Sequence, residues 1–186
     1  PRVAVLLSQL EESRTRALES ARENMGLSPG KLPIRWVLRL EYSPPVTPPV
    51  AAEAGWTEVG EKEVVVTLPA WRYLEYPAKA RRVVVHEAVH AVMASRIGTG
   101  AAYSALPRWF REGMALLVSG EGAARVQGRI AATLLAGGRP GSFLAGVYYR
   151  KPGSAAAASR LCPAEGYLAV RWFEARLGRP GLRELL

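Results

Sequence analysis

At 186 residues and 49% hydrophobic, the chain can bury one core, and it contains no run of about 18 apolar residues that would span a membrane. The formal net charge of +9 comes from arginines spread through every segment, without a dense basic run, so we expect no nucleic-acid binding. All 16 acidic residues are glutamates, which excludes Ser-His-Asp triads, EF-hand loops and aspartic dyads.

Helical and extended patterns alternate in the first third of the chain. Apolar residues recur at helical spacing over residues 3–25, and Gly26 is a natural stop, which predicts an amphipathic helix. Residues 34–42 alternate apolar and charged side chains, and residues 63–68 are rich in valine, so each stretch is predicted to be a strand. The intervening residues 43–55 contain four prolines and are expected to form a loop.

Prolines and glycines mark the limits of the later helices. Pro77 begins a helix expected over residues 77–97, and Gly98 and Gly100 end it. The remaining expected segments are helices over residues 107–120, 123–135 and 163–177, an irregular stretch at 142–154, and a short segment at 182–186 after Gly178.

The order of these elements predicts the fold class. One helix, two strands and then several helices indicate an α+β fold. We expect a single domain over residues 1–186, with an N-terminal lobe of about residues 1–100 and a helical C-terminal lobe of about residues 101–186.

The two histidines of the chain, His86 and His90, lie four residues apart within the predicted helix 77–97, and Glu87 directly follows the first. On a helix this spacing places both imidazoles on one face, one turn apart, where they can bind a single Zn²⁺ ion. Glu87 is expected to point toward the same cleft and to act there as a general base on water. A helical surface pair that binds nothing is the alternative, and the apolar flanking sequence argues against it.

A catalytic zinc ion usually has three protein ligands and one open position. Because the chain has no aspartate and no third histidine, the third ligand is a glutamate or the single cysteine, Cys162. Glu112 is our candidate, since it follows a helix start at Pro107 and an aromatic anchor at Trp109. Gly113 directly after it would let the two ligand-bearing helices approach closely. Cys162 is then expected to be an ordinary buried thiol, with a latency thiol on the zinc as the alternative.

These motifs resemble those of the gluzincins, the thermolysin-like zinc peptidases, and within them the small bacterial peptidase MA-like domains. The matching residues are His86, Glu87 and His90 in the first motif and Pro107, Trp109, Glu112, Gly113 and Ala115 in the second. The resemblance runs from about residue 64 to the C-terminus and includes Gly166, Tyr167, Phe173, Leu177 and Gly178, where the family has a tyrosine-bearing helix that ends in glycine. Metzincins fit poorly, because Met93 and Arg96 stand where they require glycine and histidine.

The resemblance implies a minimal zincin-like domain, in which a small sheet packs on the zinc-bearing helix and a mostly helical C-terminal half follows. It also implies a peptidase that acts on a peptide or protein substrate. Zinc would be bound by His86, His90 and Glu112, and Glu87 would be the general base. Tyr167 would stabilise the oxyanion, with a tyrosine that only packs in the core as the alternative and with Tyr148 and Tyr149 as weaker candidates. By fold analogy, the strand at residues 64–68 would be an edge strand that pairs with an extended substrate.

Two departures from the thermolysin pattern support a second interpretation. Ala115 and Leu116 stand where thermolysin has an aspartate that orients a zinc-binding histidine, so the orienting group is expected to be another glutamate or a backbone carbonyl. Thermolysin also uses a further histidine at the transition state, and this chain has none to spare. The alternative function is therefore a catalytically weak or inactive zinc-bearing domain for binding or scaffolding, against which Glu87 argues. Because the sequence begins with Pro1, a processed form with an extracytoplasmic or membrane-tethered location is one expectation, and the oligomeric state is open.

Overall fold

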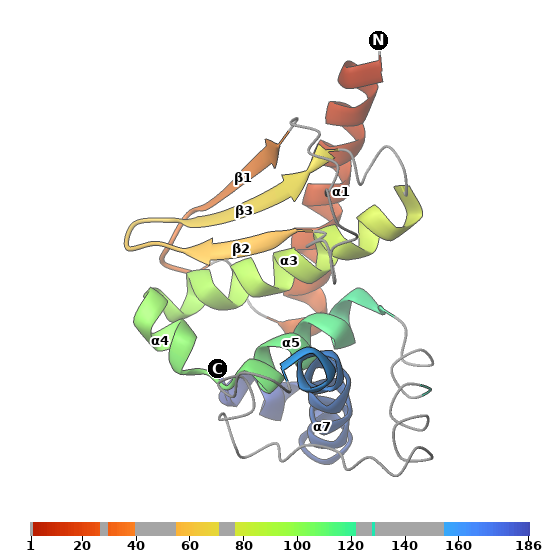
Figure 1. The fold of residues 1–186 in the computed structure, drawn as a ribbon. Coiled ribbons are helices and arrows are strands. Elements are labelled where there is room, and N and C mark those ends of the chain that lie inside the picture. Colours follow the sequence, from red (N-terminus) through yellow and green to blue (C-terminus); the bar gives the residue numbers. More distant parts are fainter. Residues whose placement is uncertain (1, 27–29, 40–54, 71–76, 122–127, 129–154) are drawn as a thin grey trace. The chain divides into compact units, whose positions relative to one another are not determined.

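The computed structural model describes residues 2–26, 30–39, 55–70, 77–121, 128 and 155–186. The chain is mixed α and β, mostly helical, with one three-stranded sheet in its described part (Figure 1), which is compatible with the predicted α+β class. It divides into two units, Pro1–Tyr103 together with Leu186, and Ser104–Leu185. Several predicted segments lie wholly or partly outside the described residues. Of the predicted helix at 123–135, only Gly128 is described. The end of the predicted strand at 40–42, the predicted loop at 43–54 and the segment at 142–154 are not described.

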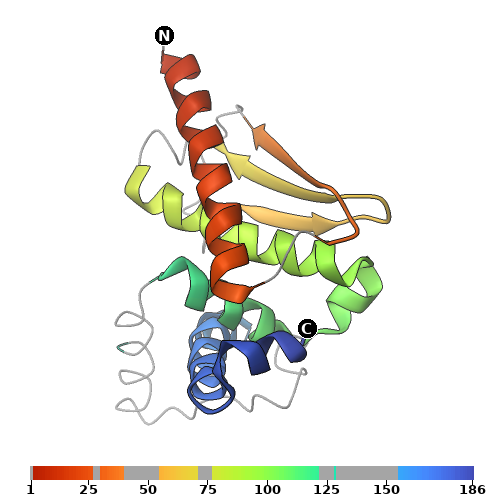
Figure 2. The same cartoon turned by 180° about the vertical axis from the view of Figure 1, so that it is seen from behind.

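The first unit contains two long helices, and both were predicted. Helix α1 (Arg2–Met25) ends at Gly26, whose φ of 59° is the left-handed conformation that stops a helix. Helix α3 (Pro77–Ile97) begins at Pro77 and ends before Gly98, with a φ of 84°. The two helices pack on each other, and α1 crosses in front of α3 when the molecule is seen from behind (Figure 2).

The sheet has the strand order β1-β3-β2 and packs on α3. Strand β1 (Ile34–Arg39) runs parallel to β3 (Val64–Pro69), while β2 (Trp56–Val59) runs antiparallel to it. β1 and β3 were predicted. The expectation that the strand at residues 64–68 is an edge strand was wrong, because β3 has hydrogen-bonded neighbours on both sides.

Strand β2 was not predicted, although the sequence contains a signal for it. Trp56, Thr57 and Val59 are residue types that favour strands, and the turn at residues 60–63 separates them from β3. The amide of Gly60 donates a hydrogen bond to the carbonyl of Glu63 at 2.9 Å, which closes this hairpin. Four residues are too few for an alternating pattern to stand out, so pairing with β3 decides that the segment is extended.

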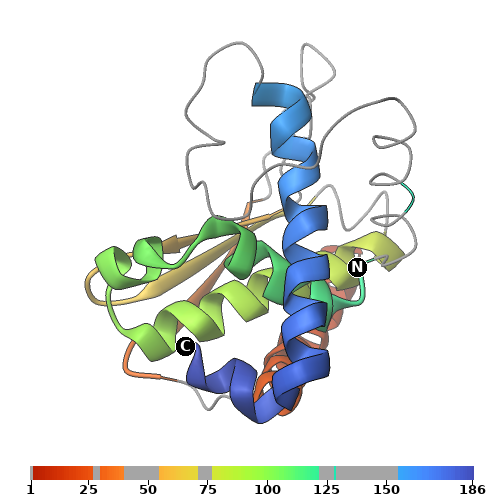
Figure 3. The same ribbon diagram turned by 90° about the horizontal axis from the view of Figure 1, so that it is seen from below.

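The second unit contains helices α5 (Arg108–Ser119) and α7 (Ala155–Glu184). Helix α5 agrees with its prediction and ends at Gly120, which has a φ of 63°. Helix α7 begins eight residues before Pro163, so the prediction that Pro163 opens this helix was wrong. The helix starts earlier because a run of alanines, the strongest helix formers, precedes the proline. At Gly178 the backbone leaves the helical conformation, and the last turns of α7 take a new direction (Figure 3).

Gly113 and Gly166 let α5 and α7 cross with their backbones in contact. A Cβ atom at Gly113 would overlap the carbonyl oxygen of Gly166, and a Cβ atom at Gly166 would overlap the carbonyl oxygen of Trp109. The predicted role of Gly113, a close approach of the two ligand-bearing helices, therefore needs correction. The helix that approaches Gly113 closely is α7.

The membrane prediction agrees with the structure as far as the structure reaches. Within the described ranges, no helix combines the length and the apolar character needed to cross a membrane.

Candidate metal centre

His86 and His90 lie on α3 with their side chains turned toward each other. Their Nε2 atoms are 3.2 Å apart, and the ring planes meet at 67° with centroids 4.9 Å apart. Two nitrogens that bind the same tetrahedral zinc ion at ~2.0–2.1 Å would lie about 3.3–3.4 Å apart. The spacing of the two Nε2 atoms therefore fits a shared metal ion.

The other ring nitrogen of His90 has a partner from a short helix that the sequence analysis missed. This helix, α4 (Gly100–Ala105), begins at the glycine that was expected to end the preceding helix. The Nδ1 atom of His90 lies 2.9 Å from the hydroxyl oxygen of Tyr103. Both side chains are buried, with exposed fractions of 8% for His90 and 5% for Tyr103. Water is thus largely kept from this pair.

Glu87 is buried against the sheet, with an exposed fraction of 7%. The hydroxyl group of Thr57 on β2 donates a hydrogen bond to Oε2 of Glu87 at 2.6 Å. Gly55, just before β2, leaves room for the glutamate, because a Cβ atom there would come within 3.1 Å of Glu87 Cγ. Burial of a carboxylate without a hydrogen-bond partner is costly, so the bond from Thr57 holds the Glu87 side chain in one position.

Glu112 lies half-buried on α5, two turns before the helix ends. Arg108, one turn earlier, places Nε 3.6 Å from Glu112 Oε1 in a partly exposed ion pair. His86 and His90 belong to the first unit and Glu112 to the second, so Glu112 as the third ligand stays a prediction. The donor set of two imidazoles and one carboxylate is a common one for zinc.

The remaining predicted site residues lie elsewhere or are not described. Tyr167 is half-buried on α7, one residue after Gly166, and its role at the oxyanion stays a prediction. Cys162 falls within α7, but its side chain is not among the described parts of the structure. Tyr148 and Tyr149 lie outside the described residues.

Two polar partners in this region, Thr57 and Tyr103, were missed from the sequence. Both lie on elements that were not predicted, β2 and α4. Thr99 was a usable signal for α4, because threonine directly before a helical stretch is a common cap. No local pattern connects either residue with α3.

Comparisons with protein-family models, with curated proteins and with solved structures found no match to this chain. The gluzincin resemblance therefore rests on the amino-acid sequence alone.

Proposed function

We propose that the chain is a zinc-dependent peptidase of the gluzincin type with a minimal zincin-like fold. The observation that carries the proposal is the 3.2 Å separation of the two histidine Nε2 atoms on α3, next to a buried Glu87. A structural role gives no physical reason to bury a carboxylate at the position after the first histidine.

In this proposal His86 and His90 bind zinc through Nε2, and Glu112 is the third ligand. The choice of Glu112 over the other glutamates follows the second sequence motif, in which Pro107, Trp109 and Gly113 accompany it. When bound, zinc would polarise the substrate carbonyl and make water a stronger acid.

Glu87 is the proton carrier in the proposed reaction. A carboxylate oxygen of Glu87 takes a proton from the attacking water and then delivers it to the nitrogen of the leaving amine. The hydrogen bond from Thr57 holds Oε2 and so fixes the direction of the other oxygen, Oε1. We assign stabilisation of the oxyanion to Tyr167, following the family resemblance.

The substrate in this proposal is a peptide or protein in an extended conformation. Since β3 is the central strand, strand addition would use an outer strand of the sheet. β2 is the better candidate, because Thr57 on this strand contacts Glu87.

The proposal is tested by measuring zinc content and casein hydrolysis together. The purified protein should contain one zinc ion per chain, lose hydrolysis when a chelator removes the metal, and regain it when zinc is returned. Protein that binds zinc but never hydrolyses casein or a peptide library would support the alternative of a zinc-bearing binding or scaffold domain. Protein that binds no zinc would contradict both.

The third ligand has a separate test. Glu112→Gln should weaken zinc binding by more than the ~10–100-fold that is typical when an outer partner of a ligand is lost. Glu184→Gln, an exposed change in the same unit, is the matched control and should leave the affinity unchanged. Equal affinities for Glu112→Gln and the wild type would remove Glu112 from the ligand set.

A further inference from the structure

The hydroxyl of Tyr103 is brought to His90 by the way in which α3 ends. Gly98 turns the chain at the end of α3 with its φ of 84°, and α4 begins two residues later. Thr99 caps α4, since its Oγ1 accepts a hydrogen bond from the amide of Ala102 at 3.1 Å. The amide of Tyr103 also donates to the carbonyl of Thr99, at 3.0 Å. The short helix thus has a fixed start, and its buried tyrosine returns to α3.

We propose that Tyr103 is a positioning residue that sets the tautomer and the ring orientation of His90. A neutral imidazole carries one N–H group, and the atom that binds a metal must be the other nitrogen. If Nδ1 of His90 carries the proton and donates to the Tyr103 oxygen, Nε2 carries a lone pair instead of a proton on the side of His86. The part of this inference that concerns metal binding rests on the proposed function.

A phenol oxygen takes the place that the sequence analysis assigned to a glutamate or a backbone carbonyl. That expectation needs correction for His90, because its Nδ1 atom lies 2.9 Å from Tyr103. A tyrosine is a neutral acceptor, so it orients the imidazole without adding negative charge to the site. In a chain without aspartate, this arrangement supplies the outer partner that metal-binding histidines almost always have.

The first experiment measures zinc affinity by competition with a chromophoric chelator. Tyr103→Phe keeps the buried ring and removes only the hydroxyl, and it should weaken zinc binding by about 10–100-fold. Thr99→Ala is the control for a merely structural effect, because it loosens the cap of α4 and leaves the hydroxyl in place. It should lower the melting temperature while changing zinc affinity much less than Tyr103→Phe does.

The second experiment needs no metal. The chain has only two histidines, so a long-range ¹⁵N–¹H spectrum of the imidazoles is simple to assign. In the zinc-free wild type, His90 should carry its proton on Nδ1, and in Tyr103→Phe the population should move toward Nε2. A wild-type His90 protonated mainly on Nε2 would overturn the inference, even if the variant did not fold.

The two experiments separate the inference from the proposed function. A wild type that binds no zinc would contradict the proposed function, and a tautomer change in Tyr103→Phe would still support the role of Tyr103. A wild type that binds zinc, with the same affinity and the same tautomer in Tyr103→Phe, would overturn the role of Tyr103 and leave the zinc site intact.

Discussion

His90 and Glu87, two buried polar residues of α3, each have a polar partner from a separate element. His90 contacts Tyr103 from α4, and Glu87 accepts a hydrogen bond from Thr57 on β2. A buried polar side chain without a partner would cost about 1–3 kcal/mol. These contacts therefore fix the directions of the His90 ring and of the Glu87 carboxylate, in addition to satisfying their hydrogen bonds.

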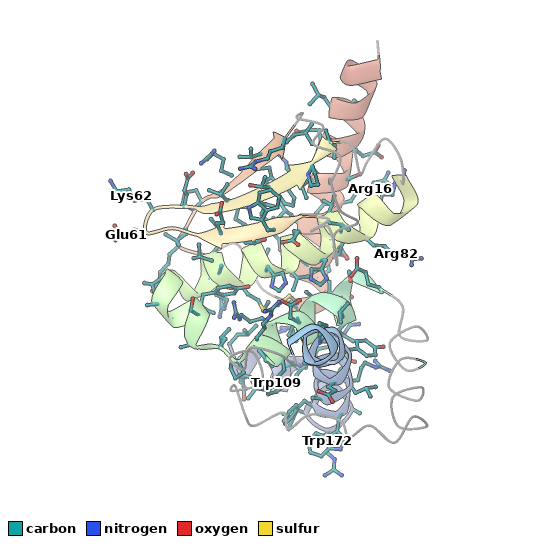
Figure 4. All side chains as sticks on the ribbon, in the orientation of Figure 1. Arg16, Glu61, Lys62, Arg82, Trp109 and Trp172 are labelled. Carbon is teal, nitrogen blue, oxygen red and sulfur yellow. The ribbon has the colours of Figure 1, made fainter. Side chains whose placement is uncertain are left out.

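Glu87→Gln should keep zinc and the fold but lower peptide hydrolysis by at least ~100-fold, because an amide cannot accept the proton that a general base must take. The measurement is hydrolysis of one peptide at matched zinc content. Glu61→Gln is the control, since Glu61 projects from the turn between β2 and β3 (Figure 4). This variant should hydrolyse the peptide at the wild-type rate. Equal rates for Glu87→Gln and the wild type would exclude Glu87 as the base.

Tyr167→Phe should lower kcat by roughly 10–1000-fold if its hydroxyl stabilises the oxyanion, with little loss of stability because only the polar tip is removed. If Tyr167 only packs, the same change should leave kcat intact and cost at most about 1 kcal/mol of unfolding free energy. Steady-state kinetics together with denaturant unfolding distinguishes these outcomes, and an unchanged kcat would end the catalytic assignment.

At the scale of elements, the crossing of α5 and α7 depends on two glycines. Gly113 directly follows Glu112, so the same short stretch supplies a proposed ligand and the contact that places its helix. Trp109 and Phe173 stack beside the crossing, with ring centroids 6.4 Å apart. The position of Glu112 within its unit is thus determined by how α5 packs on α7.

Gly113→Ala and Gly166→Ala should each lower the free energy of unfolding by at least about 2 kcal/mol, because the added methyl group meets backbone atoms that cannot rotate away. Gly128→Ala is the matched control, since nothing lies within 4 Å of a Cβ atom there. Denaturant unfolding of the three variants provides the comparison. If Gly113→Ala were as stable as Gly128→Ala, the close crossing would be wrong.

An ion pair joins β1 to the start of β3. Arg35 donates two hydrogen bonds to Glu63, at 2.9 Å from Nε and 2.8 Å from Nη2. These bonds lower the pKa of Glu63 below its usual value and raise the pKa of Arg35. The pair is exposed, so its contribution to stability is small.

Glu63→Gln should therefore lower the melting temperature slightly at neutral pH. Because the pKa of Glu63 is lowered by folding, its contribution is complete above the unfolded value of about 4.3 and is lost as the pH falls through the folded value. The difference between wild type and Glu63→Gln should shrink below about pH 4 in thermal scans. A difference that persists undiminished at pH 2 would show that the ion pair is not its source.

At the scale of the whole molecule, the proposed ligands link metal binding to folding. A ligand that binds only the folded state stabilises it by about 2.7 kcal/mol when its free concentration is 100 times Kd. Zinc should therefore raise the melting temperature of the wild type, and His90→Ala should lose most of this shift. Magnesium is the control, because it prefers oxygen ligands and should give little change. An equal shift for His90→Ala and the wild type would place the zinc elsewhere.

The sequence by itself determined the local features of this protein. Helices α1, α3 and α5 follow from apolar spacing together with Pro77, Gly26 and Gly120, because period and capping are properties of neighbouring residues. The placement of both histidines on one helix follows in the same way. Their binding of zinc stays a prediction.

Only the tertiary structure decided which distant residues meet. Thr57 reaches Glu87 across 30 positions, Tyr103 reaches His90 across 13, and Gly113 meets Gly166 on another helix. Such contacts depend on how whole elements pack, and packing leaves no periodic trace in the sequence. For the same reason β2 and its pairing with β3 could be recognised only in the folded chain, where a strand of four residues is stabilised by its neighbour.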